Sequence, residues 1–227
     1  MKLCYHIGSR ALFFEEGGRC VNSLFSDLKR AVVSLPFLCA VILQLLILQY
    51  GGFESELYRM SVPLVCTFPF SCAWLDESRS GFTRLALHRT SVFWYIAGKF
   101  TACAVSGGLC EVFAALCFCK LKHAELPPNL SLIFWCAAFW AGLSAWLAAI
   151  SESKYSAYGG AFVICYFLVI LHERYWKACH YLDPFEWLSP QCTWLFGQDS
   201  VILMLGGMTV LTGLMYACIL ERRLSHG

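Results

Sequence analysis

The chain has 227 residues, of which 59% are hydrophobic and 14% are charged, and its mean hydropathy is +0.61. Soluble domains carry about 25% charged residues and about 45–50% apolar ones, so this composition excludes a soluble enzyme, a disordered regulator and a fibrous protein. The formal net charge of +2 gives no concentrated basic face, and we expect no nucleic-acid partner. The composition indicates a polytopic membrane protein.

Six stretches are apolar enough to form membrane helices. A helix needs roughly 20 mostly apolar residues to cross about 30 Å of hydrocarbon. The fifth stretch is shorter and carries Gly159 and Gly160 near its start, which fits a tilted helix, a broken one or one that continues into the next segment. We predict an all-α fold with six transmembrane helices, at 31–50, 57–75, 96–119, 130–150, 157–171 and 200–220.

Lys and Arg are divided unequally between the two sides of these spans. Twelve of the 17 fall in the N-terminal segment, in and beside the loop over 76–95, before the fifth span and at the C-terminus. Cytoplasmic flanks of membrane helices carry an excess of Lys and Arg. We therefore expect a multi-pass protein of the cell membrane, in bacteria the cytoplasmic membrane, with both termini in the cytoplasm.

Three segments outside the spans are long enough to have structure of their own. Residues 1–30 are too polar to cross and suit an amphipathic helix lying on the cytoplasmic membrane surface; the alternative is a loosely ordered leader. Residues 76–95 form the longest internal cytoplasmic loop, and 172–199 form a long outer segment rich in Trp, Tyr and Phe. The predicted organisation is an interfacial segment followed by a six-helix domain over 31–227.

Two spans carry small residues at helical spacing. The fourth repeats alanine at every fourth position from Ala137 to Ala149, and the third carries Gly98, Ala102 and Ser106. Small residues let helices approach closely in lipid, where hydrophobicity gives little drive for association. Both stripes are therefore expected to be contact surfaces, either within the chain or between two copies.

The 14 cysteines do not indicate the disulfide scaffold of a secreted domain. Most lie in apolar runs, where Cys behaves as a small hydrophobe, and no signal peptide is visible. Cys179 and Cys192 are the two expected to face the outside, and they can be bridged only if their Cα atoms come within about 7 Å. With His172 and His180 they match no familiar zinc spacing, so we predict no metal site.

Glu111 is the acidic residue that lies well inside a predicted span. A charge at a helix centre costs about 2.5–3.5 kcal/mol on insertion scales, so such residues face a bundle interior or a cavity. Gln44 and Gln49 of the first span are its candidate partners. Gln44 and Glu111 are candidates for a substrate pathway or a proton contact; a structural hydrogen bond, or a position nearer the outer interface, is the alternative.

Motifs for catalysis and nucleotide binding are absent from the sequence. Gly98-Lys99 lacks the upstream glycine spacing of a phosphate-binding loop, and His172-Glu173 lacks the second histidine of His-Glu-x-x-His. No Gly-x-Ser-x-Gly elbow occurs. We expect no enzymatic activity on this chain.

The stretch over 75–99 resembles the ATP-binding-cassette type-2 exporter permeases, which are the transmembrane subunits of ABC transporters. In that family an acidic residue is followed four positions later by glycine, then by a short amphipathic coupling helix and a Tyr-x-x-Gly-Lys that begins the third span. The residues that fit these places are Glu77, Gly81, Leu85, Ser91, Tyr95, Gly98 and Lys99.

A second stretch, 182–190, reads Leu-Asp-Pro-Phe-Glu-Trp-Leu-Ser-Pro. It is similar to the Pro-Phe…Ser-Pro segment that precedes the last span of these permeases, where the family places short re-entrant helices on the outer side. Six spans, cytoplasmic termini and a large outer segment before the last span agree with the same family.

The resemblance implies a transport subunit that has no cofactor of its own. ATP and Mg would bind a separate ABC ATPase subunit, and a second permease, identical or related, would complete a dimer in contact with membrane lipids. A peptide, a lipid-like molecule or another amphipathic substrate would move outward by alternating access. The residues implied in coupling to the ATPase are Glu77, Gly81, Phe82, Arg84, Leu85, His88 and Arg89.

Two other functions remain as alternatives. An integral-membrane enzyme acting on lipid would need clustered acids, a Ser–Lys pair or a His-rich set near the bilayer edge. An immunity or scaffold protein that works without an ATPase would need none of these groups. A neighbouring ATPase gene would favour the exporter over both.

Overall fold

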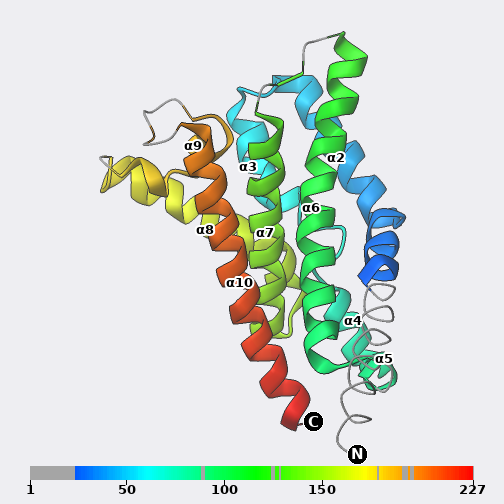
Figure 1. Ribbon diagram of the computed structural model, residues 1–227. Coiled ribbons are helices and arrows are strands. Elements are labelled where there is room, and N and C mark those ends of the chain that lie inside the picture. The colour runs from blue at the N-terminus through cyan, green and yellow to red at the C-terminus, as the bar shows by residue number, and fades with distance from the viewer. Residues whose placement is uncertain are drawn as a thin grey trace, which may run out of the picture.

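The computed structural model describes residues 24–87, 90–123, 126–127, 129–177, 179–190, 194 and 197–226. These residues form helices and connecting segments and include no strand (Figure 1), which confirms the all-α prediction. The helices are Leu24–Val32, α2 (Leu35–Gly51), α3 (Glu56–Val65), α4 (Ala73–Arg79), α5 (Phe82–Leu87), α6 (Val92–Lys122), α7 (Leu130–Ser151), α8 (Lys154–Arg174), the 3₁₀ helix η1 (His180–Leu182), α9 (Pro184–Leu188) and α10 (Gln198–His226).

Four helices of the described chain are long and apolar enough to cross a membrane: α6, α7, α8 and α10. A fifth crossing is reached if Leu24–Val32 and α2 form one span, which is bent by 49°. The bend coincides with a new helix start, because Ser34 Oγ accepts the Phe37 N–H at 3.2 Å and Pro36 occupies the first turn. The structure thus gives a membrane protein with four or five long spans, where the sequence predicted six.

The stretch predicted as the second span, 57–75, is not a single helix. α3 ends at Val65, two residues after Pro63, and turns occupy 66–72 before α4 begins. Pro63 lies inside α3 and has no N–H to donate to the preceding turn, and Pro69 lies in the turns that follow, so the segment has two positions that weaken a continuous helix. α3 and α4 lie toward opposite ends of the bundle (Figure 1), so the segment follows the length of the bundle as a broken path.

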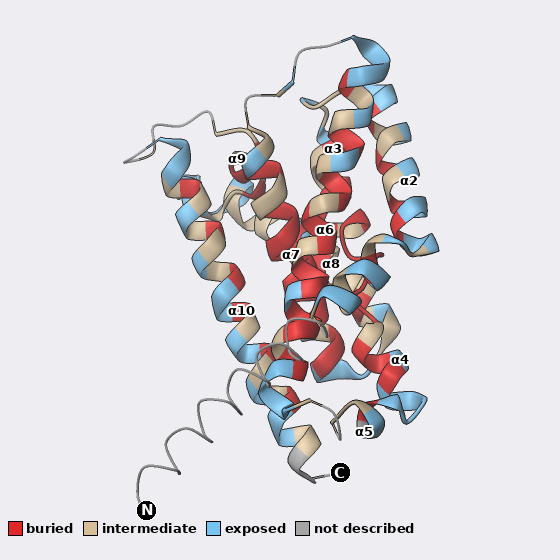
Figure 2. Ribbon diagram, turned by 45° about the vertical axis from the view of Figure 1, so that its right-hand side comes forward, coloured by how far each residue is buried: buried red, intermediate tan, exposed pale blue. Residues whose placement is uncertain are grey.

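The core is centred on α7, which packs against α6, α8 and α10. Buried residues concentrate on α6 and α7 (Figure 2), whereas α8 and α10 are 22% buried in their most apolar stretches. A Cβ added to Gly107 of α6 would lie 2.5 Å from the Ala141 Cβ, so the absence of a side chain permits this close approach. Ala141 of the fourth predicted span's stripe therefore packs within the chain, and Ala102 and Ser106 of the third span's stripe are buried in it as well.

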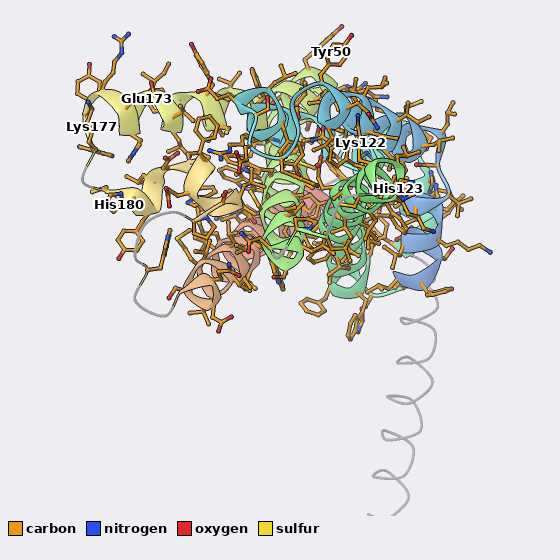
Figure 3. All side chains as sticks on the ribbon, turned by 90° about the horizontal axis from the view of Figure 1, so that it is seen from above. Tyr50, Lys122, His123, Glu173, Lys177 and His180 are labelled. Atoms are coloured by element: carbon orange, nitrogen blue, oxygen red, sulfur yellow. The ribbon has the colours of Figure 1, made fainter. Side chains whose placement is uncertain are left out.

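The described part of the outer aromatic segment is anchored on α7. The Asp183 carboxylate accepts the Phe185 N–H at 2.9 Å and begins α9. Trp187 is 1% exposed, stacks on Trp140 with 5.7 Å between ring centroids, and donates its Nε1–H to the Tyr181 carbonyl at 3.0 Å. α9 lies at the end of the bundle away from α4 and α5 (Figure 1), the end that Figure 3 shows from above.

Candidate functional site

Glu77 of α4 is the centre of a buried ionic cluster. Its side chain is 2% exposed, and its Oε1 accepts hydrogen bonds from Lys99 Nζ at 2.7 Å and from Arg30 Nη1 at 2.8 Å. Its Oε2 accepts the Tyr95 hydroxyl at 2.8 Å. Lys99 also donates to Asp27 Oδ1 at 2.7 Å. Two acids and two bases meet here, so the charges balance and every carboxylate in the cluster has a donor.

The spacing of these residues explains how three segments supply one cluster. Asp27 and Arg30 are three positions apart on Leu24–Val32, and Tyr95 and Lys99 are four positions apart at the start of α6. Residues at these spacings share one face of a helix. Glu77 of α4 lies between the two faces and contacts Arg30 of one and Lys99 of the other. A buried ion pair of this kind is strongly destabilised when one partner is removed.

The neighbouring residues of α4 contact the turn between α7 and α8 and the end of α10. Asp76 pairs with Lys154 at 2.5 Å, and Arg79 Nη2 donates to the Glu152 carbonyl at 2.9 Å. Arg223 pairs with the Glu152 carboxylate. We call this combined contact network the α4 hub; it consists of Asp27, Arg30, Asp76, Glu77, Arg79, Tyr95, Lys99, Glu152, Lys154 and Arg223.

The helix after the hub, α5, has an exposed surface. It follows Gly81, whose φ of +75° is a conformation that glycine adopts without a Cβ penalty. Phe82 is 48% exposed and Leu85 is 63% exposed. A partner at this end of the bundle would meet these two side chains first.

The residues implied in ATPase coupling divide into two groups. Glu77 is buried and its carboxylate is fully engaged within the chain, so in this conformation it cannot touch a partner, whereas Gly81, Phe82 and Leu85 are exposed. The backbone of Arg84 lies in α5, but its side chain, like His88 and Arg89, lies outside the described residues.

A second buried polar cluster surrounds Glu111, about 18 Å further along α6 from Lys99 at the helical rise per residue. Glu111 and Gln44 are fully buried, and Tyr58 of α3 is 2% exposed. Ser61 Oγ lies 3.1 Å from Gln44 Oε1. Both Glu111 oxygens, Gln44 Nε2 and the Tyr58 hydroxyl make no hydrogen bond. We call Gln44, Tyr58 and Glu111 the Glu111 site.

The structure brings Gln44 and Glu111 together, as their pairing in the sequence suggested, while Gln49 is exposed. Among the residues that the structure describes, no Lys, Arg or His forms an ion pair with Glu111. The position is buried among the helices, as expected for an acidic residue inside a span; its depth relative to the outer interface stays a prediction. Its use as a substrate contact stays a prediction.

An apolar groove of about 660 Å³ lies between α6, α7 and α10. Its lining includes Phe100 and Trp135, with Glu221 as its acidic member, and excludes Gln44 and Glu111. A Cβ at Gly142 or Gly213 would lie 2.9 Å from the Phe100 ring, so these two glycines make room for it. The groove and the α4 hub share α6, which supplies Phe100 to the groove and Lys99 to the hub.

The cysteine predictions are met only in part by described residues. Cys103, Cys110, Cys136 and Cys165 are buried thiols in the helix bundle, as expected for small apolar residues. Cys179 is a free, exposed thiol; Cys192 lies outside the described residues, so the bridge stays a prediction. Within the described ranges no three His, Cys, Asp or Glu side chains gather closely enough to hold a metal ion.

Sequence reasoning did not identify the partners of Glu77. Arg30 counts there only toward membrane topology, Lys99 counts toward topology and the family motif, and Tyr95 counts toward the motif. The signal that was available is the i, i+4 pair of Tyr95 and Lys99 at the head of an apolar helix, because a lysine that enters a span needs an acidic partner.

A comparison of the chain with protein-family models, with curated proteins and with solved structures found no match. The function is therefore argued from the geometry of the two clusters and from the sequence resemblance.

Proposed function

We propose that this chain is the membrane-spanning permease subunit of an ATP-driven exporter. It pairs with a second permease, identical or related, and with a separate ABC ATPase that binds ATP and Mg. It moves a peptide, lipid-like or other amphipathic substrate outward by alternating access and catalyses no bond chemistry itself. The observation that carries this proposal is the α4 hub, which joins one short helix to most of the bundle.

An ATP-driven permease needs an element that transmits the movement of a soluble ATPase to its spans. Through Glu77, α4 is tied to Leu24–Val32 and α6; through Asp76 and Arg79 it is tied to the α7–α8 turn. Arg223 links the same turn to α10. Because the central pair of Lys99 and Glu77 is buried, a displacement of α4 would move α6 with it, and the more exposed pairs would couple the other segments to the same movement, as in a rigid-body switch.

The exposed part of this end suits a protein partner. Phe82 and Leu85 project from α5 beside the hub. Exposed apolar side chains with a basic surround are common at protein interfaces. Arg79, Lys154 and Arg223 lie at the same end, which by the positive-inside rule is the cytoplasmic side, where an ATPase would bind.

The apolar groove supports an amphipathic cargo. Its volume of about 660 Å³ lies within the usual range for small-molecule sites. Phe100 of α6 contacts Gly142 of α7 and Gly213 of α10, and α6 also carries Lys99 of the hub. A movement of α6 driven through the hub would therefore change the width of the groove, which is how ATP hydrolysis would act on bound substrate.

The test is capture of an ATPase from native membranes. The full chain, affinity-tagged, is purified in mild detergent, and the co-purified protein is identified and assayed for ATP hydrolysis. Leu85→Asp places a charge on the docking surface without touching a buried contact, and it is expected to lower both ATPase recovery and ATPase stimulation at least tenfold. Leu126→Asp is the matched control, since Leu126 is 59% exposed and lies after α6 at the other end.

Equal ATPase recovery with Leu85→Asp and with the wild-type chain would show that α5 is not the docking surface. Failure of the wild-type chain to capture any ATPase would contradict the exporter proposal and favour an immunity or scaffold protein or an enzyme acting on lipid. Substrate-dependent stimulation of the captured ATPase would complete the assignment.

A further inference from the structure

The Glu111 site contains both hydrogen-bond donors and acceptors that have no partner. The acceptors are the two carboxyl oxygens of Glu111 on α6; the donors are Gln44 Nε2 on α2 and the Tyr58 hydroxyl on α3. All three side chains are at most 2% exposed. Buried polar groups in folded proteins are normally paired, so four unpaired atoms from three helices at one place point to a function.

The free-energy cost of burying Glu111 depends on whether its carboxyl group is ionised or neutral. A carboxylate buried without a donor or a cation is very costly, whereas the neutral acid costs far less. In the arrangement seen here the Gln44 amide lies near the carboxyl but makes no hydrogen bond of ordinary geometry to it. A carboxylate would instead attract the Gln44 and Tyr58 donors.

The surroundings contain no other charge among the described residues. The titratable groups that face Glu111 are Tyr58 on α3, Cys66 just after α3, Cys110 on α6 itself and Cys136 on α7. Gln44, from α2, is neutral. A phenol and three thiols are all uncharged when buried, so Glu111 is the group whose charge changes within this cluster.

We propose that Gln44, Tyr58 and Glu111 form a buried proton-binding site. In one state Glu111 is a neutral acid and the Gln44 and Tyr58 donors are unpaired. In the other, the carboxyl O–H bond breaks, the proton passes to a water molecule, and the resulting carboxylate accepts hydrogen bonds from Gln44 Nε2 and the Tyr58 hydroxyl. The ligand of the site is a proton exchanged with water.

Proton binding changes how the helices are held together. The ionised state draws α2 and α3 toward α6 through two charge-assisted hydrogen bonds, and protonation releases them. The ionic contacts of the α4 hub are not altered by this step. The proposal goes beyond ATP-driven transport and does not depend on an ATPase partner, because its site is formed by this chain alone.

The experiment is infrared spectroscopy of the full chain in lipid nanodiscs, titrated between about pH 5 and pH 10, the range in which buried glutamates are known to titrate. A carboxylic-acid C=O band is expected at low pH, absent from Glu111→Gln, and it should disappear as the pH rises. Tyr58→Phe removes a donor to the carboxylate, so the midpoint of this loss should move to higher pH. Tyr95→Phe, near Glu77, is the matched control and should leave the midpoint unchanged.

Identical spectra of the wild-type chain and Glu111→Gln throughout the titration would overturn the proton site. An unchanged midpoint in Tyr58→Phe would overturn the assigned partners. A second measurement needs no variant: a membrane-soluble carbodiimide adds across neutral carboxylic acids, with the acid proton moving to its nitrogen. Mass spectrometry should find the adduct at Glu111 and none at Glu77, and adduct at Glu77 alone would contradict the proposal.

Discussion

Glu77 and Glu111 are both almost completely buried, yet they lie in opposite electrostatic surroundings. Glu77 accepts hydrogen bonds from Lys99, Arg30 and Tyr95, whereas neither oxygen of Glu111 has a partner. Glu77 therefore joins the helices that supply its donors, while the Glu111 carboxyl joins no helix through a hydrogen bond of its own. The same residue type thus holds helices together at one end of the bundle and, in our proposal, binds and releases a proton in its interior.

The largest effect on the difference between Glu77 and Glu111 is expected from Lys99→Met, which removes a partner of Glu77. This change removes the buried base of Glu77 and leaves it with Arg30, whose side chain is 58% exposed; removal of one partner from a buried ion pair costs about 3–5 kcal/mol. Denaturant unfolding in detergent should show that loss in the free energy of unfolding. Lys120→Met, on an exposed lysine of the same helix, is the control. Equal losses in both variants would mean that the cluster around Glu77 contributes nothing to stability.

The second test compares two buried tyrosines. Tyr95→Phe removes a hydroxyl that donates to the Glu77 carboxylate and should cost about 1.5–3 kcal/mol, the value of a hydrogen bond to a charged group. Tyr58→Phe removes a hydroxyl that has no partner in this conformation and should leave the free energy of unfolding unchanged or raise it. The comparison fails if Tyr58→Phe proves the more destabilising of the two.

Gly107→Ala tests the packing that supports the Glu111 site. The new methyl group would lie 2.5 Å from the Ala141 Cβ and 2.8 Å from the Cys66 carbonyl oxygen, so the overpacking should cost about 1–3 kcal/mol. Gly207→Ala on α10 is the control, because nothing lies within 4 Å of its Cβ position. Thermal unfolding in nanodiscs separates the two variants, and equal midpoints would refute close packing at Gly107.

The smallest effect is expected at the solvent-exposed part of the α4 hub. Lys154 pairs with Asp76, and both side chains are about half exposed (44% and 52%). Exposed pairs contribute about 0–1 kcal/mol and are screened by salt. Lys154→Ala should therefore lose little stability at low salt and nothing measurable at high salt. A large loss that persists in high salt would show that this contact is as protected as the one between Lys99 and Glu77.

The sequence predicts the class of fold better than the course of individual spans. Long apolar runs gave the positions of α6, α7, α8 and α10 because about 20 apolar residues have no other stable place than lipid. The run over 57–75 has the same composition, yet Pro63 and Pro69 lie within it and the chain breaks into α3, turns and α4. Mean hydropathy reports how favourable the transfer of side chains into lipid is. It does not report whether the backbone of the segment can form one continuous helix.

The sequence indicates that Glu111 is buried but does not indicate this for Glu77, because only the first depends on a local residue pattern. Glu111 stands out in a sequence because it interrupts an apolar run. Glu77 lies in a polar stretch that the sequence predicts as a loop. Its burial depends on Arg30 and Lys99, which are 47 and 22 residues away in the chain. Such long-range pairing follows from the packing of three helices, which local residue patterns do not encode.

The broken course of α3 has a consequence for how the protein enters the membrane. Ten residues rise about 15 Å, which is half of the roughly 30 Å of hydrocarbon. The turns over 66–72 expose backbone groups that lipid cannot satisfy, so this stretch is stable at depth only when other helices cover it. Ser71 of these turns contacts Cys103 of α6, and Phe68 packs against Tyr158 of α8; both helices are synthesised later. We therefore expect the segment to settle in the bilayer only after α6 and α8 have been made, although it precedes both in the chain.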